Sequence, residues 1–215
     1  MENITITAVK QTKQGRFALF CGDEFLFSVD SETYFLKHIR EDMVLTPAQL
    51  DQLHRQSDTR KAKDKALQYL SLRDYASGEL YDKLCQKFDP HSAAAAVAKM
   101  QELGLLNDRA FAMHRAKYLM KQRKSRSQIL YHLSTKGIDR ETAQQVLEEL
   151  YEQCDENPDV SAALDLLQKS YGRKLREGKR QNVIAALARR GFQMGVIRQA
   201  LDRYEEENPQ QYEEY

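Results

Sequence analysis

Two runs of basic residues are the feature of this 215-residue sequence that could do chemistry most directly. Clustered lysines and arginines can neutralise nucleic-acid phosphates, or they can steer an acidic protein surface into contact. A charge run can also be a solvated face that neighbouring acids balance. We predict that the contact residues are Lys121, Arg123, Lys124, Arg126, Arg173, Lys174, Arg176, Lys179, Arg180, Arg189 and Arg190.

The distribution of charge, and not its total, supports this prediction, because the formal net charge is only +1. Residues 109–136 contain no acid, and residues 169–198 contain Glu177 alone. Acids concentrate instead at 141–159 and in the segment from Glu205 onward. Basic and acidic patches are therefore expected to alternate along the molecule.

Catalytic motifs are missing from the sequence. There is no phosphate-binding glycine loop, no GxSxG, no HExxH and no dinucleotide fingerprint. The five histidines are scattered, and adjacent acids such as Glu148 and Glu149 point in different directions on a helix. The three cysteines lack metal-ligand spacing, so we expect free thiols. We predict a non-enzymatic protein with no catalytic residue, metal or cofactor; a metal-dependent nuclease is the weakest alternative.

The elements that must position the basic residues follow from a turn that recurs three times. A leucine anchor is followed by a basic residue and then, in two cases, by a glycine that can close a helix in the left-handed conformation. The three turns are Leu84-x-x-Lys87-Phe88, Leu133-x-x-Lys136-Gly137-Ile138 and Leu187-x-x-Arg190-Gly191-Phe192. Each turn predicts the end of one helix and the beginning of the next.

Apolar residues with a 3.6-residue period flank all three turns and predict buried helix faces. Before the anchors stand Leu80, Ile129 and Val183; after them stand Ala93, Val97 and Met100, then Ala143, Leu147 and Leu150, then Ile197, Leu201 and Tyr204. Tyr69, Tyr118 and Tyr171 lie further upstream, where they could pack in the core or stack on nucleic-acid bases. Asp89, Asp139 and Ser125 are expected to cap helices. Each unit therefore reads as three helices.

The first residues follow a different pattern. Short β-branched or aromatic runs at 4–9, 16–20 and 24–29 predict a small β-meander, and Thr46-Pro47 predicts the start of a helix. The charged residues 58–65 are expected to form a connector to the first repeat. The predicted fold is mainly α: three tandem three-helix repeats forming an elongated, curved stack, with a small N-terminal β-meander plus helix. The predicted domains are 1–57, the repeats 58–107, 108–157 and 158–207, and an acidic tail at 208–215.

Localisation and assembly are expectations from the sequence alone. No stretch has the roughly 20 apolar residues that span a bilayer, and the start lacks a signal peptide. We therefore expect a cytoplasmic protein, without membrane association and monomeric.

Several of these segments, taken together, resemble one family. They are Ala66-Leu67-Gln68-Tyr69-Leu70-Ser71-Leu72-Arg73, Glu79-Leu80-x-x-Lys83-Leu84, Leu103-Gly104-Leu105-Leu106-Asn107-Asp108-x-x-Phe111-Ala112 and Lys124-x-x-x-Gln128-Ile129-x-x-x-Leu133-x-x-Lys136-Gly137-Ile138. In order and spacing they resemble the RecX family of bacterial recombinase regulators, over residues 60–205. Ala76 stands where this family often has a helix-capping serine.

The resemblance implies both a fold and a partner. RecX proteins consist of three tandem three-helix repeats that bind the helical groove of the RecA filament on single-stranded DNA and bridge neighbouring protomers. The resemblance therefore implies inhibition of the ATPase, strand-exchange and coprotease activities of RecA, with possible binding to single- or double-stranded DNA. The alternative is a helical-repeat protein that binds nucleic acid directly, without RecA.

Overall fold

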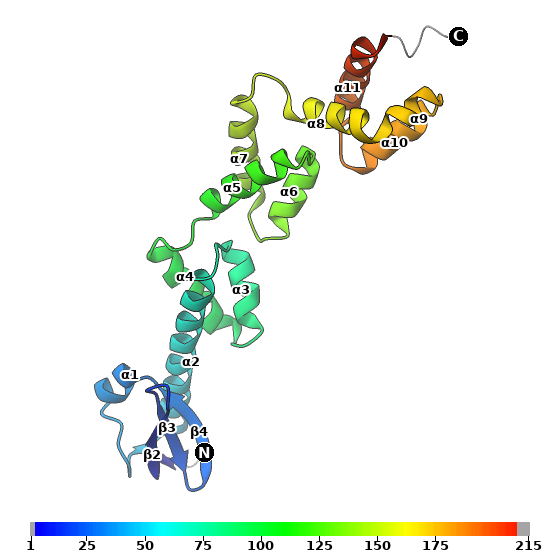
Figure 1. Ribbon diagram of the computed structural model, residues 1–215. Helices are drawn as coiled ribbons and strands as arrows, with labels where there is room; N and C mark the ends of the chain where they lie inside the picture. Colours follow the sequence, from blue (N-terminus) through cyan, green and yellow to red (C-terminus); the bar gives the residue numbers. More distant parts are fainter. Residues whose placement is uncertain (1–2, 210–215) are drawn as a thin grey trace. The chain divides into compact units, whose positions relative to one another are not determined.

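The computed structural model describes residues 3–209 and consists mostly of helices (Figure 1). It divides into two compact units, one of residues 1–75 and 79–106 and one of residues 76–78 and 107–215. The predicted acidic tail lies outside the described residues from position 210 onward.

The first unit begins with the predicted meander. Strands β2 (Ala8–Gln11), β3 (Phe17–Cys21) and β4 (Glu24–Val29) form an antiparallel sheet in that order. The predicted run 4–9 is wrong as a single strand, because β1 (Ile4–Thr5) leaves the meander and pairs with β5 (Val44–Leu45). The strand is interrupted at Ile6, which lies fully buried between the two pairings. The amide of Ile6 donates a hydrogen bond to the carbonyl of Met43.

One long helix joins the sheet to the first repeat. After the short helix α1 (Ser31–Leu36), helix α2 runs without interruption over Pro47–Leu70. Thr46 and Gln49 form a capping box at its start, which confirms the predicted helix start. The predicted connector at 58–65 is wrong: Ala62 faces the core and the charged side chains lie around it, so the segment is a helix interior.

The sheet is fixed to α2 by a polar contact near the middle of that helix. The hydroxyl of Ser57 is fully buried, donates to the carbonyl of Ser28 in β4, and accepts a hydrogen bond of 2.9 Å from Nη2 of Arg16. The apolar core of this part contains Ile6, Leu19, Phe27, Val29, Ile39, Leu45 and Leu53.

The second half of α2 is the first helix of repeat 1. It packs with α3 (Ser77–Cys85) and α4 (Pro90–Glu102), and Asp89 caps α4 as predicted, with Pro90 in the first turn. The core contains Ala62, Ala66, Tyr75, Leu80, Leu84, Ala93, Ala96, Val97, Met100 and Leu106.

Repeat 2 lies in the second unit. It contains α5 (Asp108–Lys121), α6 (Arg126–Ser134) and α7 (Arg140–Glu152). The side chains of Asn107, Ser125 and Asp139 cap these helices, which confirms the predicted capping roles of Ser125 and Asp139. Gly137 adopts a φ of 77° at the turn between α6 and α7, as its predicted role requires.

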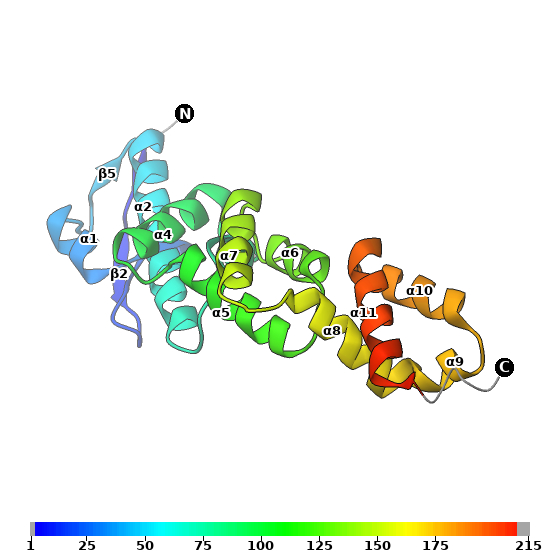
Figure 2. The same ribbon diagram turned by 90° about the horizontal axis from the view of Figure 1, so that it is seen from above.

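Repeat 3 has a longer and less regular first helix. Helix α8 (Pro158–Leu166) passes into a π-helical turn, η1 (Leu167–Tyr171), and then into α9 (Gly172–Arg176). A π-helical turn places an extra residue in a helix, and here Leu167 and Tyr171 both stay buried across it. Helices α10 (Arg180–Arg189) and α11 (Met194–Glu207) complete the repeat, and α11 packs on α8 (Figure 2).

The predicted anchors and periodic positions are confirmed in all three repeats. Leu84, Leu133 and Leu187 are fully buried, and so are the apolar residues four positions before them. All nine positions predicted after the turns are buried as well. The mainly α fold with three three-helix units and a small N-terminal antiparallel strand region is therefore confirmed.

Candidate partner-binding surface

The turn between α5 and α6 carries the first predicted basic cluster. Arg123 has a φ of 59° and closes α5 where a glycine is common, and its amide bonds to the carbonyl of Met120. Ser125 then begins α6 as a buried cap. The side chains of Lys121 and Lys124 are exposed, and they form no ion pair with any residue between 3 and 209.

The two arginines of this cluster are engaged inside the protein. Nε of Arg123 lies 2.5 Å from Oδ2 of Asp165 in α8. Nη2 of Arg126 lies 3.5 Å from Oε1 of Glu148, and its guanidinium lies 5.3 Å from the ring centre of Tyr151. The acids that the local sequence lacks are therefore supplied by other helices. Both arginines contribute to contacts around α7 and α8.

The backbone of the second basic block, residues 169–198, contacts the same turn between α5 and α6. The hydroxyl of Ser125 donates a hydrogen bond of 2.7 Å to the carbonyl oxygen of Arg190. A Cβ atom added to Gly191 would lie 2.9 Å from that hydroxyl, so the turn after α10 lies directly against the start of α6. The structure therefore brings together two basic blocks that are far apart in the sequence. We name their exposed cations, Lys121, Lys124, Arg189 and Arg190, the junction surface.

The remaining predicted residues lie around α9 and α10, and three of them form ion pairs. Arg173 and Lys179 lie 2.9 and 2.8 Å from the carboxylate of Glu177. Hydrogen bonds from Lys179 and then Arg173 lower the pKa of Glu177 to about 2, so it remains ionised at neutral pH. Arg180 forms an ion pair with Glu205 of α11.

The other cations of this region lie near one aromatic ring or in an open hollow. Nζ of Lys174 lies 5.8 Å, and the guanidinium carbon of Arg190 5.9 Å, from the ring centre of Tyr171. Arg176 lines a shallow hollow beside η1 together with Lys169 and Arg173. Lys174 and Arg176 form no ion pair within the part of the chain that the structure describes.

The three upstream tyrosines, which the sequence left open between core and surface, differ in exposure. Tyr171 is buried and Tyr69 is half-buried, so both contribute to packing. Tyr118 is 50% exposed and lies 5.1 Å from the guanidinium of Arg115. Tyr131 of α6, which the sequence did not single out, is 73% exposed.

A cluster of cations and aromatic rings in repeat 1 was also missed from the sequence. The guanidinium of Arg73 lies 3.6 Å from the ring centre of Tyr75 and pairs with Glu79. Nζ of Lys83 lies 4.9 Å from the ring of Tyr69 and 5.6 Å from that of Tyr75. Tyr69 lies in the last turn of α2 and Tyr75 in the loop that follows, so no periodic pattern pairs them in the sequence.

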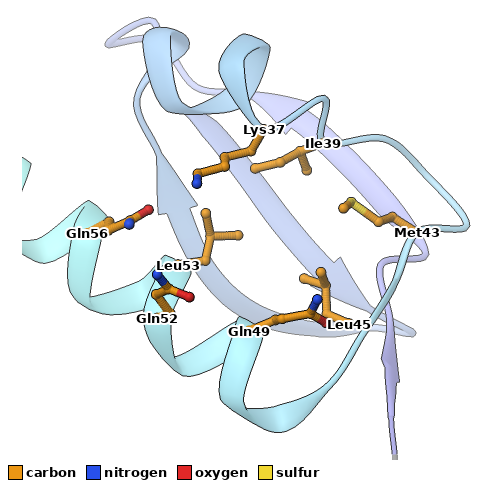
Figure 3. A pocket seen from close by; sticks show the side chains of 8 residues that line it. All are labelled: Lys37, Ile39, Met43, Leu45, Gln49, Gln52, Leu53 and Gln56. Carbon is orange, nitrogen blue, oxygen red and sulfur yellow. The ribbon is translucent and has the colours of Figure 1, made fainter.

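The first unit contains a hollow of about 210 Å³ between the segment after α1 and the first half of α2 (Figure 3). Ile39, Met43, Leu45 and Leu53 form an apolar base, and amide side chains of α2 form part of the rim. Lys37 is the one charged residue in its lining. This lining contains no carboxylate, histidine, serine or cysteine side chain that could act together with the amine of Lys37.

The described residues, 3–209, contain no further site for metal or disulfide chemistry. No group of three His, Cys, Asp or Glu side chains in this range is arranged to hold a metal ion. Cys21, Cys85 and Cys154 are free thiols, as predicted. None of the helices in the described range has the length and apolar character needed to cross a bilayer.

Three successive three-helix units define a helical-repeat protein, and the exposed cations of the junction surface lie where its second and third repeats meet. Comparison with protein families identifies the particular repeats. The first, second and third three-helix domains of RecX match residues 62–100, 107–147 and 158–201. The chain belongs to the RecX family of regulatory proteins.

Individual relatives agree with this assignment. Regulatory protein RecX of Caldanaerobacter subterraneus subsp. tengcongensis is 30% identical over 144 residues, which cover 66% of this chain and 73% of that protein. Regulatory protein RecX of Bacillus subtilis is 27% identical over 218 residues, covering 99% of this chain and 81% of the relative.

Solved structures agree with the fold. A crystal structure of a regulatory protein RecX superposes with a TM-score of 0.68 at 20% identity, covering 92% of this chain and 98% of the other. The crystal structure of RecX from Lactobacillus salivarius gives a TM-score of 0.60 at 24% identity, covering 69% and 97%.

Proposed function

We propose that this protein binds the RecA filament on single-stranded DNA, in the filament groove, where it bridges neighbouring protomers. By doing so it inhibits the ATPase, strand-exchange and coprotease activities of RecA. In this proposal the protein acts as a cytoplasmic monomer and as a regulator without chemistry of its own. Membership of the RecX family supports the regulatory role.

The observation that carries the choice of contact surface is the convergence of two basic blocks at one junction. Ser125 and Arg190 join the start of α6 to the turn after α10, and the cations on either side are exposed. Exposed cations that form no ion pair within the chain are available to pair with an acidic partner surface. Arg123, Arg126, Arg173, Lys179 and Arg180 stay in the proposed contact set, although their internal ion pairs must open or be shared on binding.

Repetition strengthens this type of binding. Several weak contacts from one chain to successive protomers of a filament add up through effective concentration, which isolated RecA subunits do not provide. We therefore expect the protein to prefer the filament over free RecA.

Titration of the purified protein into RecA ATPase reactions on single-stranded DNA tests the proposal. Inhibition at concentrations well below that of RecA supports it, and no effect at excess protein contradicts it. The variant Lys121→Glu/Lys124→Glu should weaken inhibition about tenfold or more, since two favourable contacts become repulsive. It keeps the ion pairs of Arg123 and Arg126 intact.

Lys13→Glu/Lys87→Glu is the matched control, because both lysines are exposed and lie outside the junction surface. It changes the net charge equally and should inhibit like the parent. Equal loss of inhibition in both double variants would indicate an effect of total charge, and would contradict the junction surface as the contact site.

Direct binding to single-stranded nucleic acid is the second candidate, and the exposed rings of Tyr118 and Tyr131 favour it. Both rings are exposed, and that of Tyr118 lies beside Arg115. Exposed aromatic rings can stack on bases, with a contribution of about 1–3 kcal/mol per base. Tight binding of bare single-stranded DNA that weakens steeply with salt, with no preference for RecA filaments, would favour this function. Tyr118→Ala/Tyr131→Ala should then lose affinity, while the corresponding Phe variant keeps it.

A further inference from the structure

Asp159 lies in the first turn of α8, but its carboxylate caps a helix of another repeat. Its carboxylate accepts hydrogen bonds of 3.0 and 3.3 Å from the backbone amide of Arg126, the first residue of α6. It also accepts a hydrogen bond of 2.7 Å from the hydroxyl of Tyr151 in α7. The residue is only 5% exposed. The cap of its own helix comes from Asn157, so this role of Asp159 is not needed locally.

The junction before it contains the equivalent contact. Oδ1 of Asp108, in the first turn of α5, accepts a hydrogen bond of 2.7 Å from the amide of Ser77 at the start of α3. Ser77 and Arg126 stand at the same distance before the anchors Leu84 and Leu133. Asp108 therefore supplies a cap for α3, where Ala76 occupies the position equivalent to the capping residue Ser125 and has no side-chain oxygen.

The glycine turns add a second contact at the same helix starts. A Cβ atom on Gly137 would lie 2.6 Å from the Cα atom of Gly78, and one on Gly191 would lie 3.0 Å from Cβ of Ser127. Gly78 and Ser127 again occupy equivalent positions before their anchors. Between repeats 2 and 3, the start of α6 is thus held at two points, by the carboxylate of Asp159 and by the turn at Gly191.

We propose that Asp159 is a positioning residue that fixes repeat 3 on repeat 2 and so holds the two halves of the junction surface in register. Lys121 and Lys124 belong to repeat 2, whereas Arg189 and Arg190 belong to repeat 3. A shift between the repeats separates these pairs without unfolding either one. The consequence for RecA inhibition rests on the proposed function; the geometric role of Asp159 does not.

Electron spin resonance distance measurements on the full chain test the geometric role. Nitroxide labels are attached to cysteines introduced at the exposed positions Lys117 in α5 and Arg198 in α11, after the three native cysteines are replaced. The parent is expected to give one narrow distance distribution. Asp159→Ala is expected to give a second or broadened distance population, while circular dichroism shows unchanged helix content. Asp155→Ala is the matched control, because this neighbouring acid is exposed; it should behave like the parent.

An unchanged distance distribution in Asp159→Ala overturns the proposal. If Asp159→Ala loses helix content, Tyr151→Phe decides, since it removes one hydrogen bond to the carboxylate and keeps the ring. A broadened distribution in Tyr151→Phe supports the proposal, and a parental distribution overturns it.

RecA ATPase assays then distinguish the positioning role of Asp159 from the proposed inhibition of RecA. If the parent inhibits, Asp159→Ala should need about tenfold more protein for half inhibition, because the separated halves no longer bind together. If the parent itself does not inhibit, the proposed function fails, and the distance measurement still decides the role of Asp159.

Discussion

The backbones of Gly78 and Gly137 touch: a Cβ atom added to Gly78 would lie 2.6 Å from the Cα atom of Gly137. Gly78 is the second residue of α3, and Gly137 closes the turn after α6. The sequence explains Gly137 through its left-handed conformation alone. The close contact gives a second reason for glycine at position 137. A side chain on either glycine would push the two segments apart.

We predict that Gly78→Ala lowers the free energy of unfolding by about 1–3 kcal/mol through overpacking. Gly78 does not have a positive φ, so the substitution tests the close approach and not backbone strain. Urea denaturation followed by circular dichroism measures the change. Gly195→Ala is the control: nothing lies within 4 Å of its added Cβ in helix α11, and it should raise stability by up to about 1 kcal/mol. Equal stabilities of the two variants would contradict the prediction.

Continuity of α2 through the charged segment 58–65 predicts the effect of a proline there. Asp64→Pro should cost about 3 kcal/mol or more, because it removes a helical hydrogen bond and clashes with the preceding turn. Asp64→Ala at the same exposed site should be close to neutral. Thermal unfolding compares the two. If the proline variant is as stable as the alanine variant, this segment behaves as the connector expected from the sequence.

The helix caps predict how stability depends on pH. Hydrogen bonds from Ser92 lower the pKa of Asp89, and hydrogen bonds from Thr142 lower that of Asp139, below the ordinary value of 3.8. A carboxyl group whose pKa is lower in the folded state stabilises the fold above its unfolded pKa. That contribution is lost as the pH falls through the folded pKa.

Asp89→Asn/Asp139→Asn tests this dependence, because asparagine caps helices about as well but does not titrate. Between pH 7 and pH 3, the parent should lose more stability to urea than the variant. Parallel pH profiles for the two proteins would show that the caps do not contribute to acid unfolding.

The pKa of Glu177 reports whether the cations around α9 are engaged in solution. Hydrogen bonds from Lys179 and Arg173 lower it to about 2, and we expect a carboxyl titration by NMR to find this value. Lys179→Ala should raise the pKa toward 4.5, the ordinary value for glutamate. Lys174→Ala, which removes a neighbouring cation without a bond to Glu177, should raise it much less. An ordinary pKa in the parent would mean that Arg173 and Lys179 are free for a partner.

The helical part of the fold could be predicted because each repeat has its own local signals. Leu84, Leu133 and Leu187 have apolar neighbours at helical spacing, and capping residues mark the helix starts. The charged connector was predicted wrongly, since in 58–65 a single buried alanine among charged residues does not distinguish a solvated helix from a loop. The strand pairing of Ile4 with Leu45 was not predicted, because two-residue strands leave no pattern.

The candidate site was predictable as a list of residues but not as a surface. Charge runs identify Arg123 and Lys124 equally well, yet Arg123 has an acid from another repeat beside it and Lys124 does not. Asp159 was missed because Arg126, whose amide it accepts from, is 33 residues away, and because no sequence pattern pairs Asp159 with Tyr151. The one signal in the sequence is an asparagine just before α5 and α8 that is followed by an aspartate in the first turn of each helix.

Helix α2 has a mechanical consequence. Its 24 residues correspond to a rod of about 36 Å at 1.5 Å per residue. Its first half contacts the sheet through the hydrogen bond of Ser57 and the packing of Leu53, and its second half contributes Ala62 and Ala66 to the core of repeat 1. A force applied to the sheet is therefore transmitted to the first repeat as the movement of a lever, without a flexible joint to absorb it.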